Sequence, residues 1–128
     1  GEDPYLAGVM AVPYVKELQK NGVAACVKHF ALNNQELWRG TVDVEVSDRA
    51  LYEIYLPAFK QAIVEGGAWS VMGAYNKYRG QHCCHNARLL NDILRDEWGF
   101  DGCGEELTTP KRLLLMVLTL KWGLIPTV

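Results

Sequence analysis

The sequence predicts an α/β fold with a parallel sheet, arranged as part of a TIM (β/α)8 barrel of about three βα units. Short apolar segments of strand type alternate with longer segments of helical periodicity, in the order helix, strand, helix, strand, helix. The connections that follow the strands are long and polar, whereas those that follow the helices are short and rich in glycine. This asymmetry is typical of a barrel whose functional side chains gather at the carboxyl ends of its strands.

The first predicted helix covers Tyr5–Leu18, and the first predicted strand covers Val23–Phe30. Asp3 provides an N-cap and Pro4 a first-turn proline, while Pro13 is expected to kink or divide the helix. The predicted apolar face of this helix consists of Leu6, Val9, Met10 and Tyr14. The strand has few polar residues before its end, which predicts that both of its faces are covered.

The second predicted helix runs from Ser47 to Glu65, with Pro57 as an interruption in its middle, and the strand Ala68–Tyr75 follows. Its apolar positions lie three and four residues apart. They are Leu51, Ile54, Tyr55, Phe59, Ala62 and Ile63. Gly66 and the glycine after it are expected to end this helix as a C-cap.

The third predicted helix covers Ala87–Trp98 and is capped by Asn86. The residues expected to face the core are Leu89, Leu90, Ile93 and Leu94. The turn at residues 99–102 then leads toward a third strand. Two polar loops, Asn33–Glu45 and Asn76–His85, follow the two predicted strands.

Composition and charge exclude some classes of function. The net charge is −2, and no basic stripe offers an electrostatic surface for nucleic acid. The longest apolar run, Leu113–Leu120, is too short to span a membrane. The N-terminal residues show no signal-peptide pattern, so the compartment stays open.

The sequence His82-Cys83-Cys84-His85 suggests a zinc site at first sight. Zinc ligands that are close in sequence are normally separated by two or more residues so that they can converge on the ion. Buried free thiols are therefore the favoured interpretation, with a disulfide as the alternative in an exported protein. We expect no metal and no cofactor.

Lys28 and His29 lie where the first strand is expected to end. Side chains at this end of a barrel strand face the substrate site, and two hydrogen-bonding cations suit a ligand rich in hydroxyl groups. The alternative is a polar layer that only fixes the neighbouring loops.

Five ordered motifs resemble one known family. They are G-E-D-P-Y-L-A-G, V-K-H-F-A-x-N-N-Q-E, S-D-R-A-L-x-E-I-Y-L-P-A-F, W-S-V-M-x-A-Y-N and L-R-D-E-W-G-F-D-G. Together they are similar to the N-terminal barrel of glycoside hydrolase family 3, in its β-glucosidase group, over residues 1–102. The resemblance implies exo-acting, retaining hydrolysis of terminal β-D-glucosyl residues, which requires two carboxyl groups.

The resemblance also implies which residues contact the substrate, a β-glucoside or oligosaccharide. Lys28 and His29 would hold hydroxyls of the terminal sugar, Met72 and Tyr75 would line the same subsite, and Arg39 would approach it from the loop. The alternative for Met72 is that it is only a core residue, and the alternative for Tyr75 is that it is only a packed aromatic residue.

Trp38 either stacks on sugar or covers the rim of the barrel. Asp101 is a carboxylate, but it belongs to the turn at the wrong end of its strand. Neither residue is expected to act in catalysis.

The chain departs from the family pattern after Gly102. The family continues V-V-V-S-D-W-G, whereas this chain reads C-G-E-E-L-T and contains no Ser-Asp-Trp. The expected nucleophile Asp is therefore absent, no catalytic residue is assigned, and the acid/base Glu of the family comes from a later domain. The resemblance thus predicts a fragment that lacks parts of its own barrel and a second domain. This fragment is expected not to hydrolyse glucosides.

Two alternatives remain for the function, a non-catalytic sugar-binding relative and a β-xylosidase as the parent activity. An N-acetylhexosaminidase is disfavoured, because that branch typically carries K-H-F-P-G-H-G where this chain has K-H-F-A-L-N-N.

Residues 103–128 form a second segment that does not resemble the family. One hypothesis is a shift of reading frame, because suitable synonymous codons for Cys103–Val128 also encode W-G-G-V-N-D-T-K-E-A-A-F-D-G-L-D-I-E-M in another frame. The nucleotide sequence tests this hypothesis directly. The alternative is a true terminal helix from Pro110 onward. An incomplete barrel leaves sheet edges open, which predicts poor stability for the isolated chain.

Overall fold

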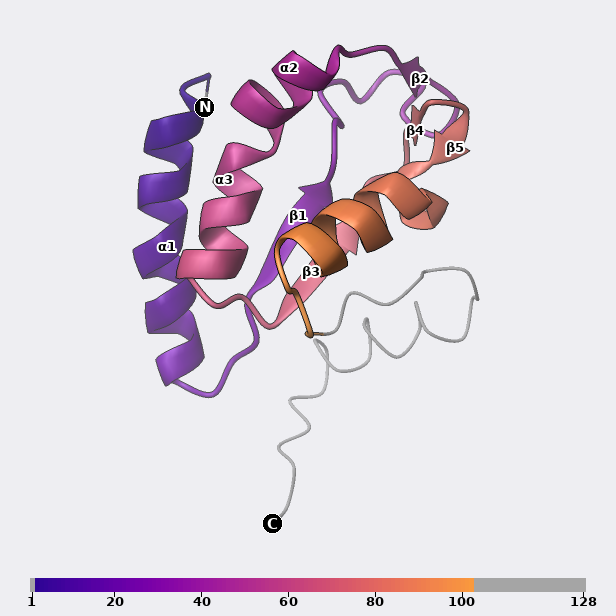
Figure 1. The fold of residues 1–128 in the computed structure, drawn as a ribbon. Helices are drawn as coiled ribbons and strands as arrows, with labels where there is room; N and C mark the ends of the chain where they lie inside the picture. The colour runs from indigo at the N-terminus through magenta and orange to yellow at the C-terminus, as the bar shows by residue number, and fades with distance from the viewer. Residues whose placement is uncertain (1, 103–128) are drawn as a thin grey trace.

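The computed structural model describes residues 2–102, which form a parallel pair of strands flanked by helices (Figure 1). Strands β1 (Cys26–Phe30) and β3 (Ser70–Gly73) pair in parallel, with Lys28 opposite Met72. The register shifts between Lys28 and Phe30. The predicted parallel order is therefore confirmed for the first two strands, but the strands do not close into a barrel within residues 2–102.

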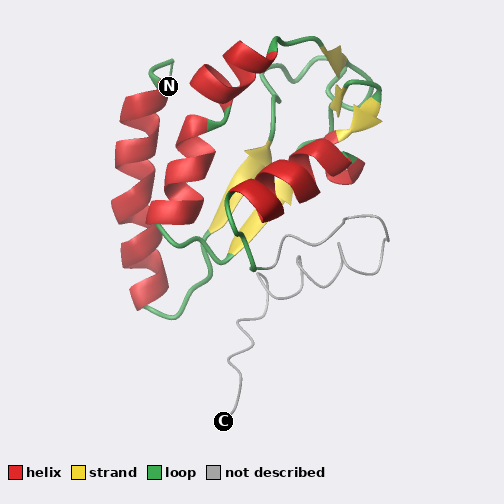
Figure 2. Cartoon of the chain, viewed as in Figure 1, coloured by secondary structure: helices red, strands yellow, loops and turns green. Residues whose placement is uncertain are grey.

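A second, small sheet lies beyond the end of β1 and β3 (Figure 2). It consists of β2 (Asp43–Val44), β4 (Lys77–Tyr78) and β5 (Gln81–His82), in the order β2-β4-β5. These strands, and the short 3-10 turn η3 (Cys83–His85), occupy segments that the sequence predicts as loops. Each strand is only two residues long, so its alternation of side chains is too brief to stand out in the sequence.

Helix α1 (Pro4–Lys20) begins at the predicted cap, where the Asp3 carboxylate accepts hydrogen bonds from the backbone N–H groups of Tyr5 and Leu6. Pro13 lies inside this helix without dividing it. None of the helices within residues 2–102 is both long and apolar enough to cross a membrane.

The second helical segment starts at Ser47, whose hydroxyl accepts a hydrogen bond from the Ala50 N–H. It continues through α2 (Asp48–Ala50), η1 (Leu51–Tyr55), α3 (Pro57–Lys60) and η2 (Gln61–Glu65). The regular pattern changes at Pro57, which has no N–H to donate to the preceding turn. The predicted interruption in the middle of this segment is thus confirmed.

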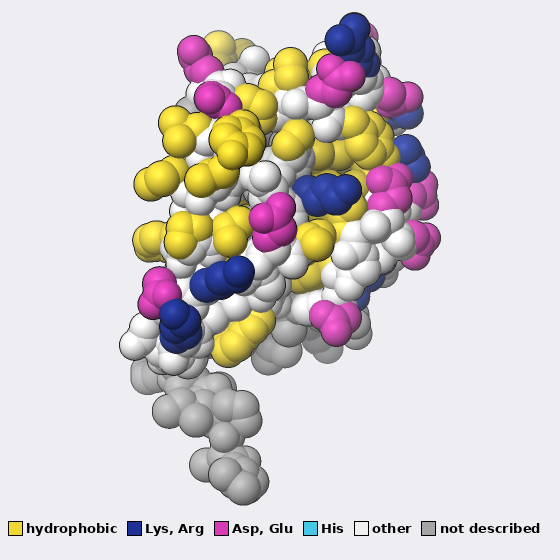
Figure 3. Space-filling view, turned by 60° about the vertical axis from the view of Figure 1, so that its left-hand side comes forward, with side chains coloured by type: hydrophobic (Ala, Val, Ile, Leu, Met, Phe, Trp, Pro, Cys, Tyr) yellow, Lys and Arg dark blue, Asp and Glu magenta, His cyan; other side chains and the backbone are white. Residues whose placement is uncertain are grey.

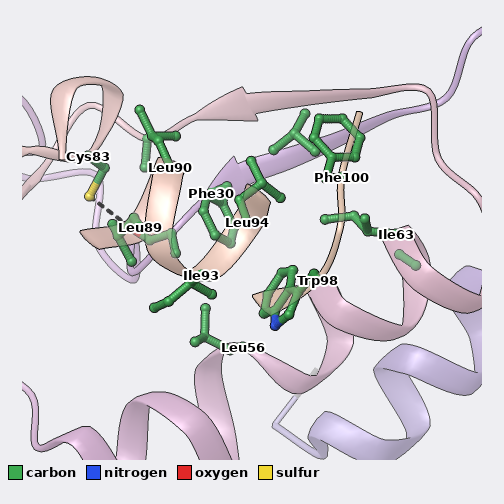
Figure 4. Close-up of a cluster of buried hydrophobic side chains, with 14 of the residues drawn as sticks. Phe30, Leu56, Ile63, Cys83, Leu89, Leu90, Ile93, Leu94, Trp98 and Phe100 are labelled. Atoms are coloured by element: carbon green, nitrogen blue, oxygen red, sulfur yellow. Dashed lines mark hydrogen bonds between the residues drawn. The ribbon is translucent and has the colours of Figure 1, made fainter. Parts of the chain in front are cut away.

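The third helix, η4 (Arg88–Glu97), is amphipathic and follows Asn86, whose side-chain oxygen accepts from the Leu89 N–H. Its inward residues Leu89, Leu90, Ile93 and Leu94 are all buried, as predicted. They pack in the core around Phe30 (Figure 4). The Phe30 ring meets Phe59 and Trp98 edge to face, at centroid distances of 5.3 and 5.8 Å.

The apolar face predicted for α1 does not face the core. The side chains of Leu6, Val9, Met10 and Tyr14 are exposed by 56%, 43%, 65% and 72%. They gather as an apolar patch over α1 (Figure 3). The helix instead turns Gly8 and Val15 inward and packs against α3 and η2. A Cβ on Gly8 would overlap the side-chain amide of Gln61, so Gly8 leaves room for that side chain against α1, and no hydrophobic pattern marks this position.

Ile54 also differs from its prediction, because it is 52% exposed. The predicted third strand and the segment 103–128 lie outside the described residues.

Candidate functional site

The end of β1 brings two of the predicted site residues to the molecular surface. Lys28 is exposed and His29 is partly exposed, whereas the next residue, Phe30, is completely buried. Met72 lies opposite Lys28 in the neighbouring strand and is partly exposed. Because residues that face one another across paired strands share a side of the sheet, the ammonium group and the thioether belong to one surface.

The segment after β3 carries Tyr75, which is 52% exposed. The Arg39 guanidinium lies over its ring, 5.2 Å from the ring centre, and also bonds the Glu36 carboxylate at 2.7 Å. This cation–π contact spans from the loop after β1 to the segment after β3. Arg39 and Tyr75 are therefore brought together, although 36 positions separate them in the sequence.

A backbone hydrogen bond connects the two halves of the site. The Ala74 N–H donates to the Phe30 carbonyl at 2.7 Å. Ala74 directly precedes Tyr75, and Phe30 directly follows His29. The structure thus places Lys28, His29, Arg39, Met72 and Tyr75 on adjoining segments at the carboxyl ends of two parallel strands.

The side chains of the segment His82–Cys84 bond to the backbone behind this site. His82 Nδ1 lies 2.9 Å from the Tyr75 carbonyl oxygen. The Cys83 thiol donates to the Ala31 carbonyl at 3.3 Å, and the Cys84 thiol donates to the Ala74 carbonyl at 3.1 Å. Both thiols are free, and Cys83 is fully buried, as the favoured interpretation predicts. This segment therefore bonds to the backbone just after both β1 and β3.

Burial raises the pKa of the Cys83 thiol to about 11, and burial also raises the pKa of the Cys84 thiol. Desolvation disfavours a thiolate in both places. Both groups therefore stay protonated at neutral pH, which is the form that donates a hydrogen bond. Within residues 2–102, no group of three or more His, Cys, Asp or Glu side chains is arranged to hold a metal ion.

Asn76 is a structural residue that was not predicted from the sequence. Its side chain is 1% exposed, and its Nδ2 donates to the Ala31 carbonyl at 3.3 Å and to the Cys83 sulfur at 3.4 Å. The available signal was an amide residue directly after a predicted strand, since a buried amide must find hydrogen-bond partners.

Asp101 is exposed and lies at the opposite end of the strands. The neighbouring Gly102 packs against the Trp69 carbonyl, which immediately precedes β3. The position expected for a nucleophile after Gly102 is outside the described residues.

Trp38 is 71% exposed and has a backbone φ of 58°. Its carbonyl accepts from the N–H groups of Thr41 and Val42, which fixes the turn that also carries Arg39. Stacking of the indole on sugar stays a prediction.

Comparison with known proteins adds an independent line of evidence. Residues 1–104 match the model of the glycosyl hydrolase family 3 N terminal domain. The chain is 71% identical over 103 residues to β-glucosidase BoGH3A of Bacteroides ovatus, covering 80% of this chain and 14% of that protein. It is 52% identical over 101 residues to an exo-α-(1→6)-L-arabinopyranosidase of Bifidobacterium longum, covering 79% of this chain and 13% of that protein.

The same part of the chain is similar to a solved structure, β-glucosidase 3B from Thermotoga neapolitana in complex with α-D-glucose. The TM-score is 0.77 at 54% sequence identity, and the match covers 79% of this chain and 14% of that one. The chain thus spans about a seventh of the length of these relatives.

Proposed function

The chain belongs to glycosyl hydrolase family 3, and from that premise we propose that it forms the sugar-holding wall of a β-glucosidase-like barrel. In this proposal the ligand is the terminal β-D-glucosyl residue of a β-glucoside or oligosaccharide. The observation that supports it best is that two pairs of these residues lie at the carboxyl ends of β1 and β3. Lys28 lies beside Met72, and Arg39 lies over Tyr75.

Each proposed contact follows from the chemistry of its side chain. The Lys28 ammonium has three donors for sugar hydroxyls, and the His29 imidazole can donate from one nitrogen and accept at the other. Arg39 adds fixed donors, and its contact with Tyr75 holds both groups in place. The Met72 thioether offers an adaptable apolar surface to the carbon atoms of the ring.

We further propose that this polypeptide binds the sugar without cleaving it. Retaining hydrolysis needs a nucleophilic carboxylate and an acid/base carboxyl about 5–5.5 Å apart. The sequence after Gly102 replaces the family segment that carries the nucleophile, and Ser-Asp-Trp occurs nowhere in the chain. The cations and the phenol of the site can orient hydroxyls, but none of them supplies a carboxylate.

A second candidate ligand is a pentopyranose. A relative with 52% identity over the same residues is described as an L-arabinopyranosidase, so a closely similar segment occurs in an enzyme named for another sugar. A β-xylosidase is the corresponding alternative for D-xylose. Binding to D-glucose, D-xylose and L-arabinose, measured side by side, discriminates among these ligands.

The test of the proposal is a titration of the 128-residue protein with D-glucose, followed by protein NMR. Lys28→Ala is expected to weaken binding roughly tenfold or more, because it removes a charged hydrogen-bond donor. Lys16→Ala is the matched control, since Lys16 is an exposed lysine on α1 away from the site. Equal affinities of wild type and Lys28→Ala would refute the assignment of the site.

A further inference from the structure

Three side-chain donors converge on two backbone carbonyls behind the candidate sugar site. The Ala31 carbonyl accepts from Asn76 Nδ2 and from the Cys83 thiol, both at 3.3 Å. The Ala74 carbonyl accepts from the Cys84 thiol at 3.1 Å. All three donors lie between positions 76 and 84, so one short segment bonds to the ends of both β1 and β3.

These carbonyls lie close in sequence to the proposed sugar contacts. Ala31 is two residues after His29, and Ala74 directly precedes Tyr75. The Ala74 N–H to Phe30 carbonyl bond, at 2.7 Å, continues the pairing of the two segments just past the last paired residues, Phe30 and Gly73. Beyond that bond, the segments after β1 and β3 are connected through the side-chain hydrogen bonds of Asn76, Cys83 and Cys84.

Internal hydrogen bonds hold together the segment that carries the donors. The Cys83 N–H donates to the Asn76 carbonyl at 2.9 Å, and β4 pairs with β5 in antiparallel fashion. The Asn86 side chain closes the same turn by donating to the Tyr78 carbonyl at 2.7 Å. The positions of the three donors are therefore fixed relative to one another.

Close packing holds the Cys84 thiol against β3. A Cβ added to Gly73 would lie 2.9 Å from the Cys84 sulfur and 3.3 Å from its Cα. The absence of a side chain at Gly73 lets the turn approach the strand backbone closely enough for the thiol to reach the next carbonyl. Burial raises the pKa of both thiols, so both remain donors at neutral pH.

We propose that Asn76, Cys83 and Cys84 form a clamp that positions His29 and Tyr75 for sugar binding. The clamp residues are positioning residues, because they act through the Ala31 and Ala74 carbonyls and are not assigned any contact with the ligand. The expected effect of the clamp on sugar affinity rests on the proposed function. Its expected effect on the geometry of His29 does not.

The test compares alanine and serine at the two cysteines in the full 128-residue protein. Cys83→Ala and Cys84→Ala remove the donors, whereas Cys83→Ser and Cys84→Ser keep a hydroxyl that can donate to the same carbonyl. Cys26→Ala is the control, because Cys26 is a free thiol on β1 outside the clamp. The measurements are D-glucose affinity and the imidazole ¹⁵N signals of His29 in sugar-free protein.

The clamp predicts that both alanine variants shift the His29 signals and weaken glucose binding by roughly three- to tenfold, the effect of one lost hydrogen bond. The serine variants should restore both values, and the Cys26→Ala protein should match wild type. Alanine variants that unfold more easily but keep wild-type His29 signals and affinity in the folded fraction would overturn the proposal. A third outcome separates the two proposals. If wild type binds no glucose, but the alanine variants shift the His29 signals and the serine variants restore them, the clamp is supported and the proposed function is refuted.

Discussion

Cys83 shows how the environment of one buried side chain sets its chemistry. It is fully buried, and burial raises its pKa from an ordinary value of 9.0 to about 11. In the unfolded chain the thiol ionises near its ordinary value, so between these two pH values only the native state keeps the proton. The stabilising effect of the buried thiol is therefore fully present below pH 9.0 and is lost as the pH rises toward about 11.

The prediction is a fall in the free energy of unfolding of about 2–3 kcal/mol between these pH values, measured by urea denaturation at a series of pH values. Cys83→Ser should flatten most of this dependence, because the serine hydroxyl does not ionise in this range. A residual slope is expected from Cys84, Tyr78 and Tyr52, whose pKa values burial also raises. An identical slope in the serine variant would contradict the assignment to Cys83.

At the residue scale, the sequence predicts the exposed contacts better than the groups that support them. Lys28 and His29 stand out because charged and polar residues interrupt an apolar strand at its end. Asn76 and Cys84 are not recognisable in this way, because their partners are backbone carbonyls far away in the sequence. Arg39 reaches Tyr75 through a loop whose conformation no periodic pattern describes.

At the scale of elements, η4 closes the core from one side, and Ile93 is completely buried in it. Ile93→Ala is expected to lower the free energy of unfolding by about 2–5 kcal/mol, because it removes buried methyl groups and leaves a cavity. Urea denaturation measures this loss.

Ile54→Ala provides the control, since the same truncation at a side chain that is 52% exposed should cost much less. Equal losses in the two variants would contradict the location of the core between the parallel strands and η4.

The helices are predictable from the sequence because caps and long apolar periodicity act locally. Asp3, Ser47 and Asn86 begin their helices where expected. The face that a helix buries is less predictable, because it depends on which neighbours are present. Helix α1 has an apolar face, but within residues 2–102 it packs through Gly8 and Val15, and the apolar face is left in contact with solvent.

At the scale of the whole molecule, this exposed face of α1 borders an apolar groove. The groove has a volume of about 590 Å³ and lies between α1 and β1, with Met10, Tyr14 and Val27 among its lining residues. Within the described residues β1 pairs only with β3, so its other edge is unpaired. Exposed apolar patches and open strand edges both favour association between chains.

We therefore predict that the isolated protein self-associates and that its melting temperature depends on protein concentration. Met10→Lys combined with Leu6→Lys should shift its sedimentation toward the smallest species, because charges in the patch oppose association. Ile54→Lys, which adds a charge to an exposed apolar side chain outside the α1 patch, is the control and should have little effect. A cooperative melt of wild type that does not depend on protein concentration would count against this prediction.

The fold and family of this molecule are more predictable from its sequence than the closure of its sheet into a barrel. Five motifs along residues 1–102 predict the family, and residues 1–104 match its N-terminal domain model. Closure of a barrel depends on strands that the described residues do not include, so the observed parallel pair is open.

We propose that this chain holds a glucoside but does not cleave it. One experiment tests both parts: titration of ¹⁵N-histidine-labelled protein with 4-nitrophenyl β-D-glucoside, in which the His29 signals and the release of nitrophenol are followed in the same sample. We expect saturable shifts of the His29 signals and no release above the spontaneous rate. Unchanged His29 signals at saturating glucoside, or release that depends on protein concentration, would contradict it.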